Sequence, residues 1–161
     1  DYLWNEVRVK GGAYGTGFQA QMNGSARFYS YRDPHLDDTL QRFDGSVEYL
    51  RGLDFDDEEL EGYVVATAAG FDQPQKARSL IRRQDSSWIC GRPPEDRIRI
   101  RNGVVGTTLN DLRSLASPLA SVLKAQAVCV FGNKDILAKS QAANRSDPLL
   151  DVVVLVGDDQ R

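Results

Sequence analysis

One short stretch, residues 17–31, alternates along this sequence with the period of a β-strand. Apolar residues recur at every second position on both sides of the dipeptide Asn23-Gly24, which is typical of a hairpin turn. We therefore predict one antiparallel strand pair here, surrounded by segments with helical periodicity. The alternating apolar residues are Phe18, Ala20, Met22, Ala26 and Phe28.

The length of the hairpin loop decides which side chains share a face. A two-residue loop would place Ala20 opposite Arg27, whereas a three-residue loop over 23–25 pairs Met22 with Ala26 and Ala20 with Phe28. Because a shift of one residue moves every side chain to the other face of a strand, we expect the odd-numbered loop.

Helical periodicity and helix-capping residues account for most of the remaining sequence. Asp33-Pro34, Asp56 with Glu59, Thr108 with Asp111, and Asn133 each have the residue types that begin helices, while Pro118 predicts a kink or break. In the helix that we expect to begin at Pro74, the residues Ala77, Leu80, Ile81 and Trp88 should face inward. The predicted helices span about 1–10, 34–50, 57–69, 74–88, 95–102, 109–123 and 134–137.

The last third of the sequence adds two apolar runs. Residues 127–131 are wholly apolar and predict a central strand with Cys129 in the core, and 140–148 predicts a loose loop. Residues 149–156 are compatible with either a strand or a helix. The predicted fold is one α+β domain over 1–161, with a mostly antiparallel sheet and helices packed on one face.

Composition restricts the classes of function. The net charge of −3 and the pI of about 5.2 argue against nucleic acid as a partner. No apolar run approaches the roughly 18 residues that a membrane-spanning helix needs, so we expect no membrane partner. Cys90 and Cys129 are widely spaced and fit a reducing compartment better than a disulfide.

A glycine-rich segment follows the first predicted helix. Gly11, Gly12, Gly15 and Gly17 surround Tyr14, and they match no phosphate-binding loop. Taken alone, this spacing fits a helix end followed by a tight turn, or a backbone that approaches a ligand closely.

Two longer motifs add to this interpretation. Residues 2–15 (YLWNEVRVKGGAYG) and 29–34 (YSYRDP) resemble the C-terminal half of pitrilysin-family (insulinase-family) zinc peptidases, and more narrowly the presequence-protease subfamily. The resemblance is specific in the first forty or so residues and looser beyond about residue 125. It implies the sandwich fold of that family. We expect the first strands to be missing, because the sequence lacks an initiating Met and begins inside a helical pattern.

The resemblance also implies the site. In such peptidases the C-terminal half supplies an arginine and a tyrosine that reach the substrate, and by motif position these are Arg8 and Tyr14. The bend Gly11-Gly12-Ala13 is then expected to lie against the substrate. A guanidinium and a phenol can both donate hydrogen bonds to a peptide oxygen that gains negative charge. Arg8 could instead stack on Trp4, four residues earlier.

The resemblance places zinc in the N-terminal half of the same polypeptide. This sequence has one histidine, His35, which we expect on the surface, and one histidine cannot build a three-ligand catalytic zinc site. We therefore predict no metal ligand here and no activity for this portion alone. The acidic cluster over 54–61 is typical of a helix start, with a calcium site as the alternative. Among the basic residues, Arg97 and Arg101 are expected on a solvated helix face.

The functional expectation is the substrate-contacting C-terminal part of a zinc metalloendopeptidase that degrades short unstructured peptides. Its partners would be the N-terminal half of the polypeptide and the peptides themselves. The alternatives are a non-catalytic structural or binding homologue of the same fold, and an unrelated ligand-binding domain. The location would be the cytoplasm in a bacterium, or the mitochondrial matrix or another organelle otherwise.

Overall fold

The computed structural model describes residues 1–144, 146 and 148–153 of the chain. The chain divides into two compact units: Asp1–Arg51 with the chain from Leu115 onward, and Gly52–Ser114 between them. In the described residues the molecule is rich in helix and has one two-stranded antiparallel sheet, so the α+β prediction is confirmed at this level.

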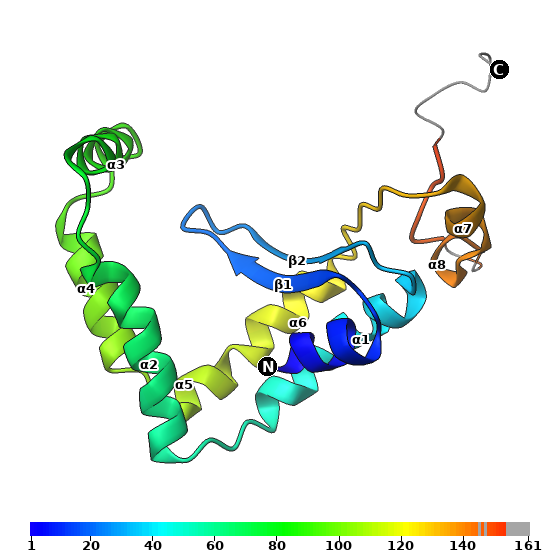
Figure 1. Cartoon of the computed structure of the whole chain (residues 1–161), viewed down its shortest axis with the longest axis horizontal. Helices are drawn as coiled ribbons and strands as arrows, with labels where there is room; N and C mark the ends of the chain where they lie inside the picture. Colours follow the sequence, from blue (N-terminus) through cyan, green and yellow to red (C-terminus); the bar gives the residue numbers. More distant parts are fainter. Residues whose placement is uncertain (145, 147, 154–161) are drawn as a thin grey trace. The chain divides into compact units, whose positions relative to one another are not determined.

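The first unit contains the hairpin and the helices that pack on it (Figure 1). The first predicted helix is present, but it is a π-helix, a rare form that often occurs at functional sites. The elements of the first unit are η1 (Trp4–Lys10), β1 (Gly15–Ala20), β2 (Ala26–Tyr31), α1 (Leu36–Arg51), α6 (Ala116–Lys124), α7 (Lys134–Lys139) and α8 (Gln141–Asn144).

The hairpin register confirms the predicted faces but not the predicted loop. Phe18 lies opposite Phe28 and Ala20 opposite Ala26, so the apolar residues share a face as expected. The predicted pairings of Met22 with Ala26 and of Ala20 with Phe28 are both wrong. The Gln21 N–H donates to the carbonyl of Ser25 and closes the turn two residues earlier on the first strand. The Asn23 side chain holds this turn, since its oxygen accepts from the Ser25 amide at 3.0 Å.

The inner face of the hairpin packs on helices through Phe28. Its ring stacks on Phe43 of α1 with centroids 4.9 Å apart, and Phe18 follows at 4.8 Å from Phe28. Phe28 also packs against two groups of buried residues, one built on η1 and α1 and one shared by α1 and α6. The helices therefore cover one face of the strand pair. The buried residues of the two groups are Val7, Ala13, Phe43, Val47, Ala116 and Leu119.

Several helix starts follow the predicted caps. Asp56 accepts from the Glu59 amide, Thr108 and Asp111 bond reciprocally, and the Asn133 side chain accepts from the amides of α7. Asp33 instead accepts from the His35 amide, and α1 begins two residues later than predicted. The break expected at Pro118 occurs at Leu115, between α5 and α6.

The structure differs from the prediction at three places near the end of the first unit. Residues 127–131 form no strand, because no described strand pairs with them, and Cys129 is exposed rather than in the core. The segment predicted as a loose loop contains α8. The first two N–H groups of α8 donate hydrogen bonds to the Asp37 carboxylate at 2.8 and 3.1 Å. Residues 149–153 are neither strand nor helix, and 154–156 lie outside the described residues.

The second unit consists of four helices: α2 (Asp57–Asp72), α3 (Ala77–Ile89), α4 (Glu95–Val105) and α5 (Leu109–Ser114). Helix α2 lies along α4. The predicted inward face of α3 is wrong, because no residue of α3 is buried and Trp88 is 84% exposed. Periodicity identifies an apolar side, but it does not establish that another element covers it.

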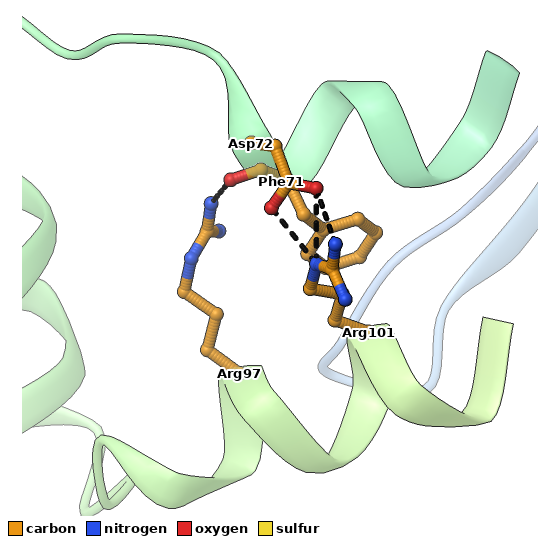
Figure 2. Close-up of polar contacts among 4 residues, drawn as sticks. All are labelled: Phe71, Asp72, Arg97 and Arg101. Atoms are coloured by element: carbon orange, nitrogen blue, oxygen red, sulfur yellow. Dashed lines mark hydrogen bonds and ion pairs between the residues drawn. The ribbon is translucent and has the colours of Figure 1, made fainter. Parts of the chain in front are cut away.

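Arginines of α4 fasten it to the end of α2 (Figure 2). Arg101 donates to both carboxylate oxygens of Asp72 at 2.5 to 3.1 Å, and Arg97 donates to the Phe71 carbonyl. The predicted solvated face is therefore only part of the picture, because both half-buried arginines also bind the end of α2. The hydrogen bonds from Arg101 hold the pKa of Asp72 below its ordinary 3.8.

Removing Arg101 should change the titration of Asp72. A carboxyl group whose pKa is lowered by folding stabilises the fold above its unfolded pKa, and this contribution is lost as the pH falls through the lowered value. We expect the Asp72 pKa, followed by NMR, to return toward 3.8 in Arg101→Gln, and the α2–α4 pairing to lose its acid sensitivity. Arg99→Gln, which removes the neighbouring pair with Asp96, is the control and should leave Asp72 unchanged.

The Phe28–Phe43 stack should carry much of the stability of the first unit. Phe43 is 8% exposed, and large-to-small substitution of such a residue costs about 3–5 kcal/mol. We expect Phe43→Ala to lower the free energy of urea unfolding by about that amount. Phe18→Ala, at a side chain that is 42% exposed, should cost clearly less, and equal losses would contradict this packing.

Candidate functional site

The backbone from Gly11 to Tyr14 is fixed by successive amide hydrogen bonds. Gly12, at φ +77°, takes the left-handed conformation, and its N–H donates to the Arg8 carbonyl at 2.9 Å. The Ala13 N–H donates to the Val7 carbonyl at 3.2 Å, and the Tyr14 N–H donates to the Tyr31 carbonyl at 3.0 Å. The bend therefore ties the end of η1 to the end of β2 and sets the direction in which Tyr14 leaves the backbone.

Gly11 is required for close packing rather than for its backbone angles. A Cβ at this position would overlap both the guanidinium of Arg42 and the Val7 carbonyl oxygen. Gly11 and Ala13 are buried, whereas Gly12 is exposed. Of the three bend residues predicted to contact substrate, only Gly12 presents an accessible backbone.

Arg8 lies on η1, half-buried, with its guanidinium carbon 3.9 Å from the ring centroid of Trp4. The stacking that the sequence left as an alternative is therefore present. A guanidinium stacked in this way keeps its N–H edge available for another acceptor. Among the described residues Arg8 has no ion pair and no side-chain hydrogen bond.

Tyr14 projects from the bend with 65% of its surface exposed. Its ring meets the edge of the Tyr31 ring, with centroids 6.1 Å apart and planes at 80°. The Tyr14 hydroxyl accepts and donates no hydrogen bond within the part of the chain that the structure describes. The phenol is thus held by its ring and free at its oxygen.

No hydrogen bond or cation–π contact joins Arg8 and Tyr14 in the described structure: Arg8 stacks on Trp4, and Tyr14 packs beside Tyr31. They are connected through the backbone, because the carbonyl of Arg8 accepts from Gly12, two residues before Tyr14. Both side chains are accessible, and neither is enclosed in the core of this unit.

The structure adds a neighbour that we did not single out from the sequence. Arg32 has φ +49°, and its guanidinium carbon lies 5.7 Å from the Tyr14 ring centroid and 5.4 Å from that of Tyr31. A left-handed conformation at a residue other than glycine costs of order 1–3 kcal/mol. The sequence motif around Arg32 held no local signal for this, because the contact joins positions 14 and 32.

Zinc ligands were sought among the residues that the structure describes. His35, the one histidine in the sequence, is exposed, and the described residues contain no group of three His, Cys, Asp or Glu side chains that could hold a metal ion. In the same described part, no helix is long and apolar enough to cross a membrane.

Comparison with known proteins identifies the family. A family model described as the PreP C-terminal domain matches residues 1–133. This chain belongs to the PreP C-terminal domain family. The match covers both sequence motifs, residues 2–15 and 29–34, and the helices of the second unit. The resemblance predicted from these motifs is therefore confirmed.

Relatives of this PreP C-terminal domain include proteins of bacteria, plants, fungi and animals. The chain is 37% identical to presequence protease 1, chloroplastic/mitochondrial, of Arabidopsis thaliana, over 84% of this chain and 13% of the relative. It is 31% identical to protein HypA of Clostridium perfringens, over 88% and 14%, and 30% identical to the mitochondrial presequence protease of Emericella nidulans, over 88% and 13%. The chain thus spans about one-seventh of the length of these relatives.

Enlarging Gly11 should disturb the bend of this PreP C-terminal domain. Added atoms in a packed site typically cost about 1–3 kcal/mol, so Gly11→Ala should lower unfolding stability and shift the backbone NMR signals of Ala13 and Tyr14. Gly15→Ala is the matched control, because nothing lies within 4 Å of the place that its new Cβ would occupy. Equal effects from the two substitutions would contradict the close contact with Arg42.

Proposed function

We propose that this chain is the substrate-contacting part of a zinc metalloendopeptidase that degrades short unstructured peptides. The observation that carries the proposal is a pair of hydrogen-bond donors without acceptors in the described structure, the Arg8 guanidinium and the Tyr14 hydroxyl. Both lie on a backbone that the bend at Gly12 fixes in place. Preorganised donors of this kind stabilise charge without having to rearrange.

The two donors suit peptide cleavage because charge appears on one atom. When a peptide bond is attacked, its carbonyl oxygen gains negative charge, and nearby donors lower the energy of that state. A guanidinium supplies a full positive charge, and a phenol supplies an O–H group that donates a hydrogen bond in one direction. The ring of Trp4, 3.9 Å from the Arg8 guanidinium, limits the orientations of that side chain and leaves its N–H edge for another acceptor.

The family supports a peptidase parent. Several relatives carry the name presequence protease, and this chain matches the model of their C-terminal domain. We propose that Arg8, Tyr14 and the exposed backbone of Gly12 meet the substrate, and that the buried Gly11 and Ala13 shape the bend. The pitrilysin-type sandwich fold and the role of the chain as one partial family domain belong to the same proposal.

The remainder of the parent polypeptide would hold the zinc ion, since this chain offers no group for it in its described residues. The N-terminal half of the parent polypeptide would then be the partner of this chain, and unstructured peptides would be the substrate. The compartment follows the organism: an organelle, as in the names of the plant and fungal relatives, or the cytoplasm in a bacterium. The absence of nucleic-acid and membrane partners stays a prediction.

Loss of the Tyr14 hydroxyl should impair turnover in the full-length polypeptide. We expect Tyr14→Phe to lower kcat by about 100-fold, because removing one such donor typically costs about 10²–10³ in rate. Zinc content and unfolding temperature should not change, since the ring contact with Tyr31 is retained.

Tyr29→Phe, at another exposed tyrosine of the hairpin, is the matched control and should keep full activity. The measurement is peptide hydrolysis with an unstructured substrate. Unchanged turnover in Tyr14→Phe would remove Tyr14 from the mechanism, and absence of hydrolysis by the native polypeptide would favour a non-catalytic homologue.

A further inference from the structure

Arg32 directly follows β2 and lies beside the ring of Tyr14. It is exposed, and its guanidinium carbon lies 5.7 Å from the Tyr14 ring centroid and 5.4 Å from the Tyr31 ring centroid. The Tyr14 N–H also approaches the Arg32 carbonyl at 3.4 Å, so backbone and side chain of Arg32 both adjoin the proposed substrate contact.

The charge of Arg32 is not neutralised within the described structure. No acidic side chain there forms an ion pair with it. The adjacent Asp33 is engaged elsewhere, because its Oδ1 accepts from the His35 amide at 2.9 Å and its Oδ2 is buried. The guanidinium thus presents its donors to solvent next to two aromatic rings.

Arg27, near the other end of β2, behaves differently. Its Nε and Nη2 donate to Oε1 of Gln19 across the hairpin, at 3.1 and 2.7 Å. Arg27 therefore has a structural use on the sheet surface, whereas Arg32 has none in the described residues beyond its ring contacts. Both arginines are exposed and belong to the same hairpin, and they differ in their neighbours.

The backbone of Arg32 adds an independent observation. At φ +49° glycine or asparagine would be the unstrained choice, yet the position carries a long cation. Strained residues concentrate at functional sites, where the surrounding structure holds them in place. The conformation turns the chain between β2 and α1 and leaves the Arg32 side chain beside Tyr14 and not along the strand.

We propose that Arg32 binds a carboxylate of the peptide substrate beside Tyr14, which makes it a residue that sets substrate preference. A guanidinium recognises a carboxylate through two parallel N–H donors, and the rings of Tyr14 and Tyr31 shield that contact from water on their sides. The inference rests on the proposed function. The carboxylate belongs either to an acidic side chain or to the C-terminus of the peptide.

The test uses the full-length polypeptide and peptides that differ only in charge. One pair replaces a single Glu near the cleavage site by Gln, and a second pair has a free or an amidated C-terminus. Because a charge-assisted hydrogen bond lost from one partner changes binding by about 10-fold or more, we expect the native protein to favour one carboxylate-bearing member by about that factor in kcat/KM. Which pair shows the preference identifies the source of the carboxylate.

Arg32→Asn should abolish that preference, mainly through KM, because asparagine tolerates the left-handed backbone and carries no charge. Arg32→Lys should retain part of the preference, whereas Arg27→Asn is the control and should retain all of it. If Arg32→Asn fails to fold, Arg32→Gly takes its place, since glycine adopts this φ without strain.

An unchanged preference in a folded Arg32→Asn or Arg32→Gly protein would overturn the inference. So would equal hydrolysis of both members of both pairs by the native protein. Either result leaves the proposed function intact if Tyr14→Phe still lowers turnover, whereas loss of effect at Tyr14 would contradict the proposed function itself.

Discussion

The left-handed turn at Gly12 is the constraint on which the geometry of the candidate site depends. It ends the π-helix and is held by hydrogen bonds from the N–H groups of Gly12 and Ala13 to the carbonyls of Arg8 and Val7. It thereby brings Tyr14 to the end of β2. A side chain at Gly11 would overlap Arg42, so the bend also needs its first glycine. The turn thereby sets where the Tyr14 phenol leaves the backbone, while Arg8 stands on the helix that precedes the turn.

Phe28 gives the hairpin a support that the strands alone lack. A two-stranded sheet is marginal in water unless something packs on it, and here the Phe28 ring joins Phe43 of α1 and the residues near α6. The outer face can then remain polar and aromatic, with Tyr29 and Tyr31 exposed. Packing on one face thus leaves the side chains of the other face accessible.

Local chemistry could be predicted from the sequence, and distant pairing could not. The caps at Asp56, Thr108 and Asn133 depend on residues two or three positions away, and each is present. The strand expected at 127–131 depended on a neighbouring strand that the described residues do not supply. Motif resemblance made Arg8 and Tyr14 the candidate site residues, whereas the proposal for Arg32 came only from its distance to the ring of Tyr14, far earlier along the chain.

The link between Asp37 and the start of α8 has a consequence for the order of folding. Its two hydrogen bonds join positions 104 and 105 residues apart, and the whole second unit lies between them in the chain. Closing so long a loop costs conformational entropy. The hydrogen bonds can offset this cost only after both ends of the loop have come together. During synthesis the hairpin and α1 can assemble early, while the α8 end waits for the intervening helices to leave the ribosome.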